Sequence, residues 1–121
     1  MSHRERVVVV TGGASGIGLG ICKVFAARGH PVAMLDVQQD LLDRESAALR
    51  SGGATILARR VDVADRAEVD AAYADIRREL GPITIVVANA GISTPEPFET
   101  MSAASWQRMI DIDLTGVFHT V

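Results

Sequence analysis

The sequence contains few of the residues on which several common kinds of site depend. It has one cysteine, Cys22, so it cannot form an internal disulfide bond. Cys22 falls among apolar neighbours at helical spacing, and we expect it to be buried. Its three histidines, His3, His30 and His119, have no metal-ligand spacing and no serine partner. We therefore predict no metal site and assign the histidines no chemistry.

Positive charge and long apolar runs are also scarce. The chain has 12 Lys and Arg against 15 Asp and Glu, a net charge of −3, so it offers no basic face for nucleic acid or an anionic membrane. No apolar run approaches the roughly 18 residues of a membrane-spanning helix. Residues 1–6 are polar and too few for a signal peptide. These absences favour a cytoplasmic protein with a small-molecule partner.

The pattern that is present alternates strand-like and helix-like stretches. With 121 residues and 48% hydrophobic content, residues 1–121 are expected to form a single domain. We predict strands over 6–10, 32–36, 54–61 and 83–88, and helices over 15–28, 38–49, 65–80 and from 103 onward, with Ser102 as the cap of the last one. This alternation is typical of a parallel sheet covered by helices on both faces.

Three details of these elements can be tested. The first helix is expected to bury Ile17, Ile21, Val24 and Phe25. The helix over 65–80 has Asp65 as its N-cap and Glu68 three residues later, as in a capping box; Val69, Tyr73, Ile76 and Leu80 line its buried face. The apolar run over 83–88 is expected in a strand covered on both faces.

The most informative stretch is Thr-Gly-Gly-Ala-Ser-Gly-Ile-Gly at 11–18, between the first strand and the first helix. Glycines allow a sharp turn and close backbone approach, while the open amides of a helix N-terminus attract a pyrophosphate. A P-loop is excluded because Leu19 follows Gly18 and the only lysine is Lys23. A Gly-x-Gly-x-x-Gly pattern from Gly16 fails at Ile21.

Asp36 ends the second strand about 20 residues after the glycine turn, where an acid accepts hydrogen bonds from an adenosine ribose. The same carboxylate would repel the additional phosphate of NADP. Two like charges about 4 Å apart cost roughly 4 kcal/mol at an effective dielectric of 20. The sequence therefore predicts NAD as the preferred cofactor.

The spacing Gly12-x3-Gly16-x-Gly18 after Thr11 resembles the short-chain dehydrogenase/reductase family. Asp62-Val63 is similar to the family's adenine-pocket segment, and Asn89-Ala90-Gly91 is similar to its Asn-Ala-Gly motif. The resemblance implies a Rossmann-type α/β fold, here a three-layer parallel sheet of about four strands that stops before the fifth. It also implies hydride transfer between a nicotinamide and an alcohol or carbonyl substrate. The candidate cofactor-binding residues are Thr11, Gly12, Ser15, Gly16, Ile17, Gly18, Asp36, Asp62, Val63, Asn89, Ala90 and Gly91. Ser15 agrees with NAD, because family members that use NADP often carry a basic residue there.

The resemblance also shows a departure and an absence. Asp113 stands where the family has an asparagine that assists a proton relay, and a carboxylate cannot donate as an amide does. The family's serine and Tyr-x3-Lys have no counterpart within 1–121, because the only tyrosine, Tyr73, is followed by Arg77. The chain by itself is therefore predicted to be inactive. The alternative is a short protein without catalysis that binds NAD or self-associates.

The strand over 83–88 would present an exposed apolar edge if no further strand covers it. Such an edge pairs readily with another chain. We therefore expect a homo-oligomer.

Overall fold

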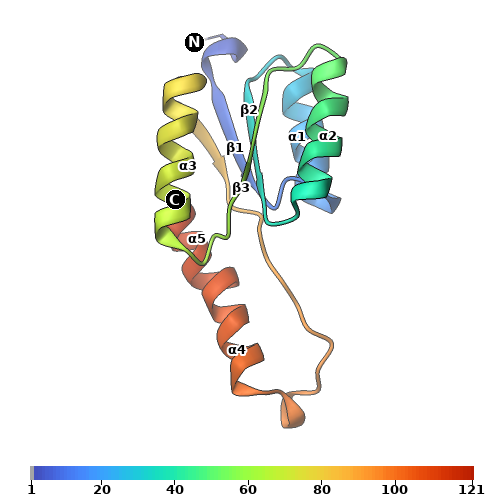
Figure 1. The fold of residues 1–121 in the computed structure, drawn as a ribbon, viewed down its shortest axis with the longest axis vertical. Helices are drawn as coiled ribbons and strands as arrows, with labels where there is room; N and C mark the ends of the chain where they lie inside the picture. The colour runs from blue at the N-terminus through green and yellow to red at the C-terminus, as the bar shows by residue number, and fades with distance from the viewer. Residues whose placement is uncertain (1) are drawn as a thin grey trace.

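The computed structural model describes residues 2–121 as one parallel sheet with helices on both sides (Figure 1). The strands are β1 Val7–Thr11, β2 Val32–Asp36, β3 Ile56–Arg60 and β4 Ile83–Val87, in the spatial order β3-β2-β1-β4. The helices are α1 Gly16–Ala27, α2 Gln39–Ser51, α3 Arg66–Glu79, α4 Ala103–Ile110 and α5 Gly116–Thr120; a π-helical segment, Asp111–Thr115, joins the last two. Short 3-10 turns lie at His3–Glu5 and Phe98–Thr100.

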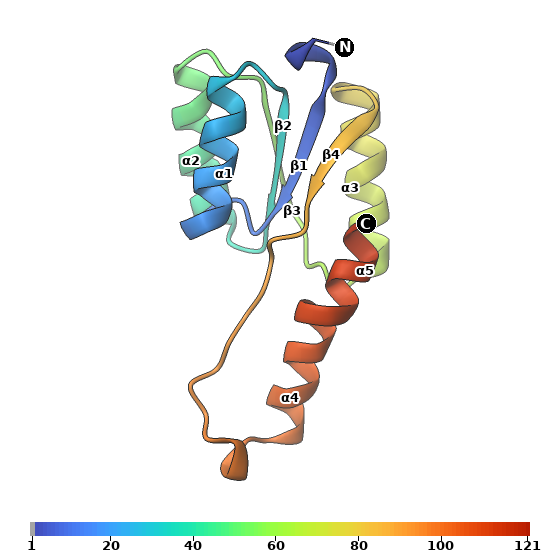
Figure 2. The same cartoon turned by 180° about the vertical axis from the view of Figure 1, so that it is seen from behind.

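The run of four valines in β1 is buried on both faces of the sheet. Val7 and Val9 pack in a cluster with Val69 and Ile76 of α3, whereas Val8 and Val10 pack on α1 and α2. Figure 2 shows α1 and α2 on one side of the sheet and α3 on the other. A parallel strand covered by helices on both faces needs apolar side chains at every position, as this run has. The predicted three-layer Rossmann-type fold is confirmed.

The predicted buried face of α1 is partly wrong. Ile17 is 79% exposed and Val24 is 51% exposed, although Ile21 and Phe25 do pack against the core. The residues of α1 that are buried are instead Gly18 and Cys22. Cys22 is buried, as predicted, and burial raises the pKa of its thiol to about 12. The face is rotated because Gly18 must lie against the glycine turn, where no larger residue fits.

The cap of α3 is as predicted. The Asp65 carboxylate accepts hydrogen bonds from the amides of Ala67 and Glu68. The Glu68 carboxylate, however, lies 3.6 Å from the Arg60 guanidinium, so it pairs with the end of β3. Since that pair is largely exposed, it adds little to the stability of the fold.

The apolar run of β4 is less covered than predicted. β4 lies at the edge of the sheet and pairs with β1 alone among the described strands. Ile85 and Val87 pack towards α1 and α2, but Thr84 is exposed and Val86 is 38% exposed. Because an edge strand has a neighbour on one side only, its outward side chains keep contact with solvent. Self-association through this edge stays a prediction.

The final helical stretch extends beyond the sheet (Figure 2). Ser102 caps α4, as predicted, by accepting a hydrogen bond from the Ser105 amide at 3.0 Å. At the far end α5 is held against α3, because the half-buried Tyr73 hydroxyl donates to the Thr120 carbonyl. Burial raises the pKa of Tyr73. No helix among residues 2–121 is long and apolar enough to cross a membrane.

Candidate functional site

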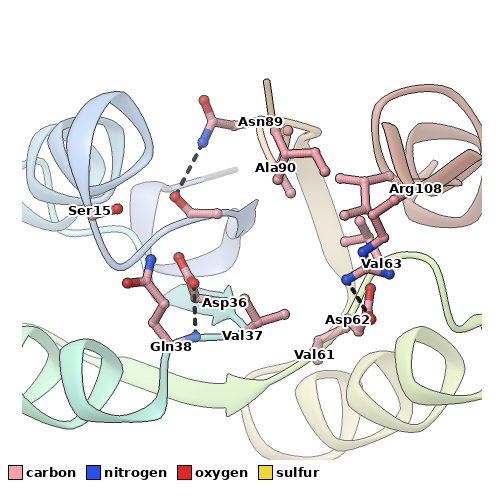
Figure 3. Close-up of a pocket in the computed structure, with 14 residues that line it drawn as sticks. Ser15, Asp36, Val37, Gln38, Val61, Asp62, Val63, Asn89, Ala90 and Arg108 are labelled. Carbon is pink, nitrogen blue, oxygen red and sulfur yellow. Dashed lines mark hydrogen bonds and ion pairs between the residues drawn. The ribbon is translucent and has the colours of Figure 1, made fainter. Parts of the chain in front are cut away.

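A cavity of about 370 Å³ lies at the carboxyl ends of the strands (Figure 3). This edge is where parallel α/β sheets form their ligand crevices. Of the residues singled out in the sequence, the cavity is lined by Gly12, Ser15, Asp36, Asp62, Val63, Asn89, Ala90 and Gly91. The other four are outside its lining, at the end of β1 and in the first turn of α1: Thr11, Gly16, Ile17 and Gly18. The structure therefore brings segments from four separate strand ends to one place.

The glycine turn has the backbone shape that only glycine adopts readily. Gly12 and Gly16 have φ values of 63° and 55°, in the left-handed region. A Cβ atom on Gly18 would lie 2.0 Å from the Gly12 carbonyl oxygen, so α1 packs directly on the turn. Ser15 precedes α1 as its N-cap, and its side chain makes no capping hydrogen bond. The first-turn amides of α1 are therefore open for an anionic ligand.

Thr11 and Asn89 connect this turn to the segment after β4. The Thr11 hydroxyl oxygen accepts hydrogen bonds from the amides of Asn89 and Ala90, both at 3.0 Å. In return, the Asn89 side-chain amide donates to the carbonyls of Thr11 and Gly12 at 3.1 and 3.2 Å. Thr11 is 2% exposed, so its hydroxyl is shielded from water. It fixes the distance between two walls of the cavity.

Asp36 lies at the end of β2 and is 7% exposed. One of its carboxylate oxygens accepts from the Ala14 amide and the other from the Gln38 amide, each at 3.0 Å. A carboxylate offers about four acceptor positions, so two backbone bonds leave capacity for a ligand. The side chain is thus held rigidly while it can still accept hydrogen bonds from hydroxyl groups in the cavity.

Asp62 and Arg108 form a second polar wall. One Asp62 oxygen accepts from the Ala64 amide at 3.0 Å, and the other lies 3.1 Å from a terminal nitrogen of Arg108 on α4. Asp113 lies outside the cavity lining and accepts a hydrogen bond from the Ile92 amide at 2.8 Å. It therefore tethers the segment after β4 to the π-helical segment.

Six lining residues were missed in the sequence: Val37, Gln38, Val61, Ile92, Arg108 and Ile112. Val37, Val61 and Ile92 are immediate neighbours of predicted residues and Gln38 is two positions after Asp36, and that proximity was the available signal. Arg108 and Ile112 had no local signal, because only the packing of the last helices brings them to the cavity.

His30 and His119 serve the fold. Their Nδ1 atoms lie 2.9 Å from the Arg6 carbonyl and 2.7 Å from the Val63 carbonyl, so each imidazole donates to the backbone there. Over the described part of the chain, no three His, Cys, Asp or Glu side chains are grouped so as to hold a metal ion.

Comparison with known proteins identifies the family. A protein-family sequence model described as short chain dehydrogenase matches residues 6–121. The chain belongs to the short-chain dehydrogenase family. Members of this family are oxidoreductases that use nicotinamide cofactors and act on small alcohol or carbonyl substrates.

Curated relatives match nearly the whole of this short-chain dehydrogenase sequence. Cis-4-hydroxycyclohexanecarboxylate dehydrogenase of Sinomonas cyclohexanicum is 44% identical over 93% of the chain and 45% of its own length. 2-(S)-hydroxypropyl-CoM dehydrogenase 3 of Xanthobacter autotrophicus is 36% identical over 98% of the chain and 47% of its own length. The chain therefore spans about half the length of the curated relatives it matches.

Solved structures agree with this short-chain dehydrogenase fold. A short-chain dehydrogenase/reductase from Burkholderia phymatum, solved in complex with NAD, superposes with a TM-score of 0.95 at 28% identity. The match covers 100% of this chain and 43% of that one. The sheet and its helices are thus arranged as in the corresponding part of that enzyme.

Proposed function

We propose that this chain forms the cofactor-binding part of a short-chain dehydrogenase that prefers NAD over NADP. The observation that carries the proposal is Asp36, whose carboxylate is held at the cavity wall with spare acceptor capacity. The two hydroxyls of a ribose can donate hydrogen bonds to the acceptor positions that remain on this carboxylate. A phosphate on the same ribose would instead bring negative charge to a nearly buried carboxylate.

The glycine turn fits the diphosphate of the dinucleotide. Gly12 lines the cavity with backbone alone, and Gly18 of α1 packs directly on its carbonyl. The Ser15 hydroxyl and the first-turn amides of α1 can donate hydrogen bonds to a diphosphate, because no side chain caps that end of the helix. The turn therefore binds and orients the negative part of the cofactor.

The remaining walls fit the two ends of the cofactor. Asp62 and Val63 supply an acceptor and an apolar surface for the adenine ring. Asn89, Ala90 and Gly91 hold the backbone at the opposite wall through the network with Thr11. A dinucleotide bound here would supply the hydride chemistry, exchanged between its nicotinamide and an alcohol or carbonyl carbon. Asp113 positions the start of the loop after β4 by accepting from the Ile92 amide, and it donates no proton there.

The test is a comparison of NAD and NADP affinities in the Asp36→Asn variant. Removing the charge weakens charge-assisted hydrogen bonds that are worth about 1.5 to 3 kcal/mol each, so NAD affinity should fall at least about tenfold. NADP affinity should rise relative to NAD, because the repulsion is relieved. Isothermal calorimetry on the purified protein measures both affinities.

Asp70→Asn is the matched control, because Asp70 lies on the exposed surface of α3, away from the cavity, and pairs only with Arg66. It should leave both affinities unchanged. A wild-type protein that binds NADP more tightly than NAD, or an Asp36→Asn variant with unchanged selectivity, would refute the proposal.

A further inference from the structure

Arg108 is the one cationic side chain that lines the cavity among residues 2–121, and it has no role in the proposal above. It reaches from α4 to Asp62, 46 positions earlier in the chain, with its terminal nitrogen 3.1 Å from the carboxylate (Figure 3). The side chains of Arg108 and Asp62 are 49% and 24% exposed. Ion pairs this exposed contribute about 0 to 1 kcal/mol to folding, so stability alone is a weak reason for the contact.

The helix that carries Arg108 is anchored to the same segment as Asp62. A Cβ atom on Gly116 would lie 2.6 Å from a Val63 methyl group, so the start of α5 packs closely on that segment. The His119 imidazole donates to the Val63 carbonyl at 2.7 Å. These contacts fix the helical stretch beside Asp62, and Arg108 projects from the same stretch towards the cavity.

The two partners of Asp62 hold its carboxylate at both oxygens. The Ala64 amide donates to one oxygen at 3.0 Å and Arg108 donates to the other. Two donors at opposite ends fix the plane of the carboxylate, and its remaining acceptor positions are left for a ligand. A ligand that covers Asp62 also removes water from its carboxylate. The free-energy cost of this desolvation is smaller when the carboxylate is already paired with a guanidinium.

We infer that Arg108 is a positioning residue that holds Asp62 as the acceptor for the 6-amino group of the bound purine. Arg108 thereby gives the cavity part of its selectivity for a purine with a donor at this position. The inference rests on the proposed function, since the purine belongs to the dinucleotide. Arg108 acts through Asp62 and touches neither the diphosphate nor the reacting carbon.

The experiment compares two ligands that differ only in the amino group, AMP and purine riboside 5′-monophosphate. Titrations followed by NMR chemical shifts on the purified protein measure weak binding of both. Wild type should bind AMP about tenfold more tightly, as expected for one hydrogen bond to a charged group. Arg108→Gln should reduce this preference by roughly threefold or more, the range of coupling between contacting residues. Arg108→Lys keeps the charge and should retain part of the preference.

Two further variants separate positioning from a structural role. Asp62→Ala should abolish the preference, and adding Arg108→Gln to it should change the preference no further. Arg44→Gln is the matched control, because this exposed arginine pairs with Glu45 on α2 outside the cavity. Equal weakening of both ligands by Arg108→Gln would show that Arg108 only supports the fold and would overturn the inference. A wild-type protein without preference for AMP would overturn it as well.

The proposed function and the inference about Arg108 can be refuted independently, because the first is tested by dinucleotide binding to the Asp36 variant and the second by AMP binding to the Arg108 variant. A protein that prefers AMP through Arg108 but binds NADP more tightly than NAD would refute the proposed NAD preference and leave the purine inference standing, because both dinucleotides carry the same purine. A protein that prefers NAD, and whose preference for AMP does not depend on Arg108, would refute the inference about Arg108 and support the proposed function.

Discussion

Gly18 offers the sharpest test of how the glycine turn and α1 fit together. A Cβ atom there would lie 2.0 Å from the Gly12 carbonyl oxygen and 2.5 Å from the side-chain nitrogen of Asn89. Real Cβ atoms essentially never approach backbone atoms so closely. The Gly18→Ala variant must therefore move α1 away from the turn or break the hydrogen bonds of Asn89.

The size of the effect follows from these two responses. Forcing a methyl group into a packed site costs about 1 to 3 kcal/mol. Displacing the Asn89 amide from the carbonyls it now contacts at 3.1 and 3.2 Å costs about 1 kcal/mol more for each lost bond. We expect Gly18→Ala to lower the free energy of unfolding by about 3 kcal/mol or more.

Gly20 supplies the matched control on the same helix. A Cβ atom on Gly20 meets nothing within 4 Å, so Gly20→Ala should stabilise α1 by about 0.5 to 1 kcal/mol through helix propensity alone. Urea unfolding followed by circular dichroism measures both variants against wild type. If Gly18→Ala unfolds within about 0.5 kcal/mol of wild type, as surface substitutions do, the close packing of α1 on the turn is refuted.

Three further predictions concern single side chains. Thr11→Val removes the hydroxyl that accepts two loop amides and should cost at least about 2 kcal/mol in urea unfolding, whereas Thr11→Ser should keep most of the stability. Burial raises the pKa of the Cys22 thiol from 9.0 to about 12, so the folded state retains a proton that the unfolded state releases, and stability should fall as pH rises from 9.0 to about 12. A pH series of unfolding midpoints should show a smaller fall in Cys22→Ala, and equal slopes in the two proteins would contradict this account. Asp113→Ala should speed hydrogen exchange at the Ile92 amide, while Asp113→Asn keeps an acceptor oxygen and should leave exchange slow. Unchanged exchange in Asp113→Ala would mean that the hydrogen bond contributes nothing in solution.

Features that depend on neighbours in the chain were predicted well from the sequence. The valine run of β1, the boundaries of β2, the cap at Asp65 and the cap at Ser102 all follow from local composition and spacing. The glycine turn and Asp36 were located because strand ends in a parallel sheet meet at one edge. Local propensity and the alternation of strands and helices were therefore sufficient for the fold class, whereas the wall residues Asp62, Val63 and Asn89–Gly91 were indicated by the resemblance to family motifs.

Features that depend on contacts between distant segments were decided only by the tertiary structure. Helical periodicity suggested that Ile17 and Val24 are buried, but the contact of Gly18 with Gly12 rotates α1 so that both are exposed. The contact between Arg108 and Asp62 joins positions 46 apart, and no spacing rule reaches that far. Sequence determined which elements form and where their ends lie, because each turn or strand is stabilised locally. Packing determined which face is buried and which side chains meet, because these depend on the shapes of surfaces that become neighbours only in the folded chain.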